Sequence, residues 1–334
     1  MRALAWAGNV LYASRGYTLL SADIGSGPPI HWREVARFNP PWWRNLTVTT
    51  PLTFRLVRDG FHALAGLSSG ALVAAVPGAI VTLHPGDTEF QATHKILRGT
   101  RPLHICVGSD GTVYFGEYFD NPARDEVHIY ASTDRGINWD VAYTFPKSAI
   151  RHIHNVVYDR WVNCLWILTG DNGDECRILR ASCDLKNIET VLAGNQQARA
   201  VAAVPTAEGL YYSSDTPFET NHLYRLDRNG NVHVLADIAS SSIHGCNVGS
   251  ALFFSTMVEP SAVNLEESSC LYGSLDGAHW LRQLSWKKDR WPLGLFQYGN
   301  ALLPDGYNHT DILAVSTVAV SPGDLETSLW RVVR

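Results

Sequence analysis

Residues 101–134, RPLHICVGSDGTVYFGEYFDNPARDEVHIYASTD, contain the pattern that decides the fold. An Arg and a His open the stretch, and two short apolar segments, TVYFGEY (112–118) and HIYASTD (128–134), follow with a turn between them. Three later stretches repeat this order, beginning at Arg151, Arg199 and Ser241 and continuing through CLWILTGD (164–171), GLYYSSD (209–215) and ALFFSTM (251–257). The chain therefore contains an internal repeat built from short strands.

Spacing and length together predict the architecture. Successive repeats begin 42 to 50 residues apart, and an earlier one begins at Arg58. Four short strands in a unit of about 40 to 50 residues are typical of a β-propeller. We predict an all-β, seven-bladed β-propeller in one domain, residues 1–334, with six or eight blades, or a pair of β-sandwiches, as alternatives. The predicted blades are 1–36, 55–92, 101–145, 151–192, 199–236, 242–284 and 294–334.

Closure of the ring requires the two ends of the chain to meet. Because closure removes exposed sheet edges, we expect the N-terminal strand to complete a blade with the C-terminal segment SLWRVVR (328–334).

Composition excludes several classes of protein. Of the 334 residues, 46% are hydrophobic and 18% are charged, which argues against disorder and against a coiled coil. A net charge of −5 without a basic cluster argues against nucleic-acid binding. No apolar run approaches the roughly 18 to 20 residues of a membrane span. Oligomeric state is left open by the sequence.

The location of the protein is inferred from its N-terminus and its cysteines. The residue pattern at the N-terminus predicts a strand, and it lacks the apolar core and the cleavage site of a signal peptide. The six cysteines have no CxxC spacing and are expected to be free thiols. These features predict a cytoplasmic protein, with a secreted form whose signal has been removed as the alternative.

A further motif gives a family resemblance. Residues 132–139, STDRGINW, fit the pattern S-x-D-x-G-x-x-W, and residues 274–280, SLDGAHW, are a version shorter by one residue. On this motif the chain resembles the sialidase-like Asp-box (BNR repeat) β-propellers, and in blade layout and His/Arg content it resembles propeller polysaccharide lyases and glycosidases. In the motif the Asp should accept from turn amides, the Gly should take a positive φ and the Trp should pack between sheets. These roles are structural.

Candidate site residues recur at equivalent positions of the repeat. The loop that enters each inner strand and the loop between the second and third strands open on one face of a propeller, so residues there should converge on one funnel mouth. The candidate substrate-binding residues are Arg58, Arg101, Arg151, Arg199, His152 and Gln297. The candidate catalytic residues are His104, His154, His244, Glu117, Asp171 and Asp215. A structural girdle of ion pairs is the alternative interpretation of the arginines.

These residue types favour an anionic saccharide as the ligand. Guanidinium groups pair with carboxylates bidentately. In β-elimination an Arg or a metal ion neutralises the uronate carboxylate, a His or Tyr removes the adjacent proton, and a second His or Tyr protonates the leaving oxygen. The first alternative is a sialidase-like glycoside hydrolase that uses the Glu/Asp rim. The second is a non-catalytic scaffold or sugar-binding protein in polysaccharide metabolism.

A divalent metal ion is the one cofactor that the pattern suggests. His104, His154 and His244 are its candidate ligands, with Gln297 or water completing the set. A separate stretch, PPWWR (40–44), is expected either to fill the space between two blades or to form an aromatic platform beside the ligand.

Overall fold

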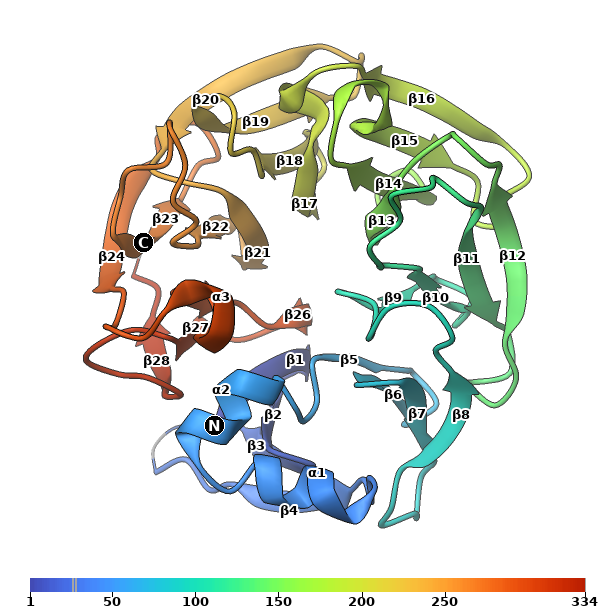
Figure 1. The fold of residues 1–334 in the computed structure, drawn as a ribbon, viewed down its shortest axis with the longest axis vertical. Helices are drawn as coiled ribbons and strands as arrows, with labels where there is room; N and C mark the ends of the chain where they lie inside the picture. The colour runs from blue at the N-terminus through green and yellow to red at the C-terminus, as the bar shows by residue number, and fades with distance from the viewer. Residues whose placement is uncertain (26, 28, 334) are drawn as a thin grey trace.

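Seven sheets surround a central axis and form a seven-bladed β-propeller (Figure 1). The computed structural model describes residues 1–25, 27 and 29–333. Strands contain 49% of the residues and helices 7%. The predicted fold class is therefore confirmed.

Each of the first four blades contains four consecutive antiparallel strands, ordered from the central axis outward, and in the first blade a fifth strand lies inside them. The first contains β1 (Arg2–Gly8), β2 (Val10–Arg15), β3 (Thr18–Asp23) and β4 (Arg33–Arg37). The second contains β5 (Ala63–Gly66), β6 (Leu72–Val76), β7 (Ala79–Leu83) and β8 (Gln91–Lys95). The third contains β9 (Cys106–Val107), β10 (Val113–Gly116), β11 (Val127–Ser132) and β12 (Asp140–Phe145). The fourth contains β13 (His152–Asp159), β14 (Cys164–Gly170), β15 (Arg177–Ala181) and β16 (Ile188–Ala193).

The last three blades follow the same radial order. The fifth contains β17 (Ala200–Pro205), β18 (Gly209–Ser214), β19 (Asn221–Asp227) and β20 (Val232–Ile238). The sixth contains β21 (Ser242–Val248), β22 (Ala251–Thr256), β23 (Ser268–Ser274) and β24 (Leu281–Lys287). The seventh contains β25 (Asn300–Leu302), β27 (Ile312–Val318) and β28 (Thr327–Arg331).

The ring closes differently from the prediction. The C-terminal strand β28 pairs with β27 alone, and β1 pairs with β2 inside the first blade. Closure comes instead from β26 (Asp305–Asn308), which leaves the seventh blade and pairs in parallel with β1. Pro304 precedes β26 and has no N–H to donate, so the chain cannot extend the β27 ladder there and moves to the first blade. The expectation of a blade shared by both termini was wrong.

Apolar packing between neighbouring blades forms the core. Seven clusters of buried residues among the described part of the chain each connect two adjacent blades. One joins Leu19 of the first blade to Leu64 of the second, and another joins Trp6 of the first blade to Ala314 of the seventh. Neighbouring blades cover both faces of a middle strand such as β14. This strand is therefore buried along its whole length, and its sequence, CLWILTG, is largely apolar.

The S-x-D-x-G-x-x-W segment forms the turn between β11 and β12. The Asp134 carboxylate accepts hydrogen bonds from the backbone N–H groups of Ile137 and Asn138, at 3.1 and 2.9 Å. Gly136 has a φ of +83°, and a Cβ there would lie 2.7 Å from the Thr82 hydroxyl of the second blade. Trp139 packs on Phe115, with ring centroids 5.1 Å apart. The three residues therefore have the structural roles that the motif predicts.

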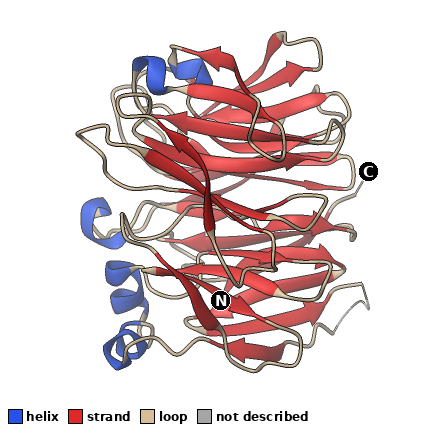
Figure 2. Ribbon diagram, turned by 90° about the vertical axis from the view of Figure 1, so that its right-hand side faces the viewer, coloured by secondary structure: helices blue, strands red, loops and turns tan. Residues whose placement is uncertain are grey.

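Short helices lie on one face of the disc (Figure 2). They are α1 (Trp42–Thr47), α2 (Pro51–Val57), α3 (Leu293–Phe296) and the single 3-10 turns η1 (Gly173–Glu175) and η2 (Gln196–Ala198). The PPWWR stretch leads into α1, and its Trp42 side chain is 75% exposed, so this residue does not fill an interblade space. No helix in the described ranges is long and apolar enough to cross a membrane. All six cysteines are free.

Candidate functional site

The predicted arginines stand where the chain enters an inner strand. Arg58 ends α2, while Arg101, Arg151 and Arg199 precede β9, β13 and β17. The helices occupy equivalent connections, before inner strands or between second and third strands. The arginines therefore lie toward the face of the disc on which Figure 2 shows the helices, and we call it the entrance face.

A cavity of about 410 Å³ opens in the middle of this face. Its wall includes Arg2, Arg58, His62, Arg101, His104 and His244. Thr50 and Phe54 of the α1–α2 region and Gln297 after α3 also contribute to it. The buried Arg55 side chain fixes α2 in place by donating to the Phe296 carbonyl at 3.0 Å. The volume suits a small ligand.

One side of the cavity carries an excess of positive charge. We call Arg2, Arg58, His62 and Arg101 the channel cluster. His62 Nε2 lies 2.6 Å from the Arg58 carbonyl oxygen, which can only accept, so this nitrogen carries the proton. His62 Nδ1 is then the acceptor for Arg2 Nη1 at 3.0 Å, and His62 is neutral.

Among the residues that the structure describes, no arginine of the channel cluster forms an ion pair with an acidic side chain, although the charges of Asp305 and Asp59 act on Arg2 and Arg101. Burial and the proximity of Arg2 and Arg58 lower the pKa of Arg101 to about 9. The Arg58 and Arg101 side chains have no hydrogen bond or ion pair with any residue that the structure describes. The nearby Asp59 carboxylate is buried and already binds Arg44, Thr47 and Tyr17. Two guanidinium groups at the cavity wall therefore remain available to an anion.

Two further histidines line the same cavity. His104 Nδ1 lies 3.0 Å from Asp305 Oδ2, and the rings of His104 and His244 are 6.1 Å apart. Since the carboxylate accepts the Nδ1 proton, Nε2 of a neutral His104 is the basic nitrogen. Burial, and to a smaller extent the neighbouring His104, lower the pKa of His244 to about 3. His244 is therefore a neutral imidazole at neutral pH.

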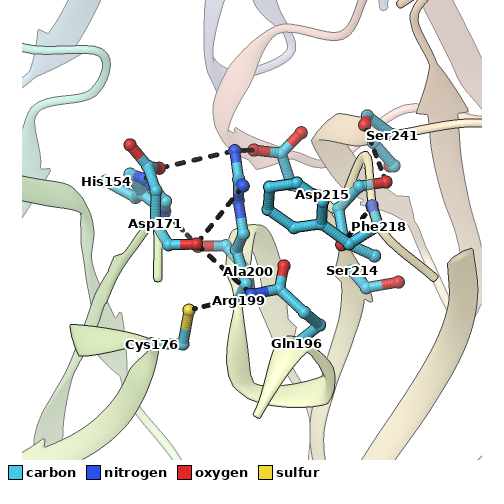
Figure 3. A network of polar contacts seen from close by, with 12 residues as sticks. His154, Asp171, Cys176, Gln196, Arg199, Ala200, Ser214, Asp215, Phe218 and Ser241 are labelled. Atoms are coloured by element: carbon cyan, nitrogen blue, oxygen red, sulfur yellow. Dashed lines mark hydrogen bonds and ion pairs between the residues drawn. The ribbon is translucent and has the colours of Figure 1, made fainter. Parts of the chain in front are cut away.

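A second group of polar residues lies between the fourth and fifth blades (Figure 3). We call Arg151, His152, His154, Asp171, Arg199 and Asp215 the interblade cluster. Asp171 follows β14, and its carboxylate lies 3.2 Å from Arg151 Nη1 and 3.4 Å from Arg199 Nη2. Arg199 also lies 3.7 Å from Asp215. Here the arginines have carboxylate partners.

The two carboxyl groups of the interblade cluster differ in pKa. Burial raises the pKa of Asp171, but hydrogen bonding with His152 and His154 outweighs it, so the net pKa is well below the usual range. Burial raises the pKa of Asp215 to about 6, and the long contact with Arg199 offsets this only in part. Burial and the Asp171 charge raise the pKa of Tyr118, whose ring is tilted against His152 with centroids 4.5 Å apart, to about 12.

The remaining sequence-predicted residues have local partners. Glu117 accepts from Arg98 Nε at 3.0 Å and from the His128 backbone N–H at 2.8 Å. Gln297 donates to the Arg55 carbonyl at 3.0 Å. Arg151 and Arg199 contact Asp171 and are not among the residues that line the cavity, whereas Arg58 and Arg101 are. The three-histidine metal site is also absent from the described residues, since His154 lies with His152 rather than with His104.

Sequence reasoning missed Arg2 and Asp305. Arg2 opens β1, the inner strand of the first blade, and so occupies the same position as the other arginines. Extending the repeat alignment to the first blade would have found it. Asp305 opens β26, whose departure from its blade has no counterpart in the other repeats.

Comparison with known proteins defines the fold only. No protein-family model matches the sequence, and no curated protein matches it significantly. Many chains of solved structures, 1116 in all, are similar in structure, so the architecture by itself does not distinguish functions. One of them, from a crystal structure of the mitotic checkpoint complex, aligns with a TM-score of 0.60 at 10% identity, covering 100% of this chain and 90% of that one.

Proposed function

We propose that the central cavity binds an anionic saccharide that carries a uronic acid. The observation that carries this proposal is the channel cluster: Arg58 and Arg101 face a 410 Å³ cavity without an acidic partner. Guanidinium groups that repel one another, here the half-buried Arg101 beside the exposed Arg58, are stabilised when a carboxylate binds between them. A saccharide-sized molecule with one carboxylate meets both requirements, charge and volume.

The histidines of the cavity support β-elimination as the reaction. A carboxylate held by Arg101 acidifies the adjacent C–H bond. Nε2 of His104, oriented by Asp305, then accepts the proton, and the electron pair of the C–H bond forms a C=C bond as the C–O bond breaks. The leaving oxygen takes a proton from solvent or from a second group. Hydrolysis by two carboxylates has less support, because the candidate carboxylates already have partners. Glu117 binds Arg98, and Asp171 contacts both Arg151 and Arg199.

Binding is tested with an oligogalacturonate as the probe, by calorimetry. Arg101→Met should weaken binding by about 30-fold or more, the loss expected for a desolvated charge pair of roughly 2 kcal/mol or above. Arg37→Met is the matched control, because Arg37 lies on the outer strand β4 and is paired with Glu34. Equal binding by both variants would contradict the proposal.

Catalysis is tested separately by the absorbance of an unsaturated product. His104→Ala should lower turnover by about a hundredfold while leaving binding largely intact. If the protein binds the oligogalacturonate but forms no unsaturated product, it is a sugar-binding protein and the elimination is excluded.

A partner-binding scaffold is the second candidate function, because the entrance face exposes apolar side chains. Trp42, Leu46, Leu56 and Leu295 on the three helices are 75%, 59%, 48% and 58% exposed. Exposed apolar groups that gather on one face are typical of interaction sites. For a scaffold, a Trp42→Ser/Leu295→Ser double variant would lose its partner in a pull-down, whereas Arg101→Met would keep it.

A further inference from the structure

The interblade cluster contains two imidazoles that face each other through the same kind of nitrogen. His152 Nε2 and His154 Nε2 lie 3.0 Å apart. The other nitrogen of each ring faces a backbone carbonyl: His152 Nδ1 is 3.0 Å from the Phe119 oxygen, and His154 Nδ1 is 2.8 Å from the Ala200 oxygen. A carbonyl oxygen only accepts hydrogen bonds, so both Nδ1 atoms carry protons.

This assignment leaves an electrostatic problem at the Nε2 atoms. In a neutral imidazole with its proton on Nδ1, Nε2 presents a lone pair. The two lone pairs therefore point toward each other, and Asp171 Oδ1, a third electron-pair donor, lies 3.2 Å from His154 Nε2 and 3.5 Å from His152 Nε2. Three such donors in a buried site repel one another unless a cation lies between them, either a metal ion or a second proton on one imidazole that is then donated to Asp171.

We propose that His152, His154 and Asp171 bind a divalent transition-metal ion, of which Zn²⁺ is the best match. Zn²⁺ binds imidazole nitrogen and carboxylate oxygen at about 2.0 to 2.2 Å, and tetrahedral geometry then places ligand atoms about 3.3 Å apart. The three separations of 3.0, 3.2 and 3.5 Å fit this triangle. The site differs from the three-histidine set suggested by the repeat, and it does not depend on the proposed saccharide.

The surroundings of the site match those of metal-binding histidines. Ligand histidines commonly donate their second N–H to a backbone carbonyl, as His152 and His154 do. Arg151 contacts the other oxygen of the Asp171 carboxylate, Oδ2, and so orients Oδ1 toward the rings. Gly170 keeps the space open, because a Cβ there would lie 2.4 Å from His154 Cε1.

Local charge limits the affinity but does not prevent binding. Arg151 and Arg199 place two positive charges near Asp171, while Asp120, Asp171 and Asp215 are the acidic groups that pair with them. Three carboxylates against two guanidinium groups leave the site without an excess of positive charge. A three-ligand set also leaves a fourth position for water or another ligand.

The test is a zinc titration of the EDTA-treated protein by calorimetry, with no saccharide present. The wild-type chain should bind one Zn²⁺ with a dissociation constant in the micromolar range or below, and Co²⁺ in its place should give the visible absorption of a tetrahedral site. His152→Ala and His154→Ala should each weaken Zn²⁺ binding at least 100-fold. His104→Ala, which alters the other histidine pair, should leave it unchanged.

The wild-type measurements keep the proposal testable if a buried-histidine variant fails to fold. Saturating Zn²⁺ should raise the melting temperature of the wild-type protein, since a ligand that binds only the folded state stabilises it. Absence of zinc binding by the wild-type chain would overturn the proposal, and the two Nε2 atoms would then share a proton. Binding that survives in both His152→Ala and His154→Ala would also overturn it.

Discussion

The channel cluster and the interblade cluster arise from the same repeat position but differ in charge balance. Arg58 and Arg101 face a cavity without acidic partners, whereas Arg151 and Arg199 contact the Asp171 carboxylate at 3.2 and 3.4 Å. The Asp59 carboxylate, which lies next to Arg58 in the connection into the second blade, already binds Arg44 and Tyr17. The comparison teaches what decides the role of an Arg at this repeat position. Where a nearby carboxylate is free to pair with it, the Arg has a structural role, and where the nearby carboxylate is already occupied, the Arg can bind a ligand.

Removing the shared acid of the interblade cluster should have the largest effect on stability. Asp171→Ala leaves Arg151 and Arg199 without the carboxylate between them, and breaking a buried pair in this way costs about 3 to 5 kcal/mol. We expect the free energy of unfolding to fall by that amount in urea titrations of the metal-free protein. A loss below about 1 kcal/mol would show that the interblade cluster is solvated and that the contrast with the channel cluster is false.

In the channel cluster, removing a charged side chain should increase the free energy of unfolding. Arg101→Met removes a charge whose pKa burial and two neighbouring arginines have lowered to about 9. A long apolar side chain at the cavity wall should raise the free energy of unfolding by about 2 kcal/mol. The measurement requires a buffer without phosphate, sulfate or carboxylate, because a bound anion would stabilise the wild-type protein. Destabilisation in such a buffer would mean that Arg101 has a structural partner.

Asp215 provides a test of the electrostatics by pH. Its folded-state pKa of about 6 lies above the ordinary value of 3.8, so the folded protein holds this proton more tightly than the unfolded chain does. Stability should therefore decrease as pH rises from about 4 to 6, and the full cost is present at pH 7. Asp215→Asn should remove that slope and raise stability at pH 7 by about 2 kcal/mol, less the contribution of the long contact with Arg199.

The control for Asp215 is the same pH series on Asp237→Asn, an exposed acid on β20. It should keep the wild-type slope between pH 4 and 6. An unchanged slope in Asp215→Asn itself would contradict the assignment.

The number of blades could be predicted because it depends on local signals. Strand spacing, turn residues and apolar segments recur in each unit, and each unit packs mainly against its neighbours. Closure could not be predicted in the same way. It depends on Pro304 and on the diversion of β26 to β1, and both occur once.

The candidate site was predictable in composition but not in grouping. The repeat in the sequence predicts that the Arg and His residues lie toward the entrance face. It does not predict the distances between side chains of different blades. The pairing of His154 with His152 and of His104 with Asp305 depends on which side of an inner strand each ring occupies. Strict alternation along β13 would place His152 and His154 on one face. The register of β13 shifts between Ile153 and Asn155, and the two Nε2 atoms lie 3.0 Å apart.

The smallest expected effect concerns a carboxylate that belongs to neither cluster. Asp134 accepts from the backbone N–H groups of Ile137 and Asn138 and from the Ser132 hydroxyl, the last at 2.8 Å. Slight burial raises the pKa of this carboxyl, but the hydrogen bonds outweigh it and lower the pKa to about 2. Because the site is largely solvated, Asp134→Ala should cost only about 1 kcal/mol in thermal or urea unfolding.

The pH dependence of that loss identifies its cause. A carboxyl whose folded-state pKa lies below its unfolded value stabilises the protein above about pH 4, and the contribution disappears as pH falls toward 2. The difference between wild type and Asp134→Ala should therefore shrink over this range. Asp276→Ala should behave alike, because Asp276 accepts from the Ala278 and His279 N–H groups in the equivalent turn of the sixth blade. Neither variant should change oligogalacturonate or Zn²⁺ binding, and a loss of either ligand would place these turns in contact with a site that the present geometry keeps on the opposite side of the sheets.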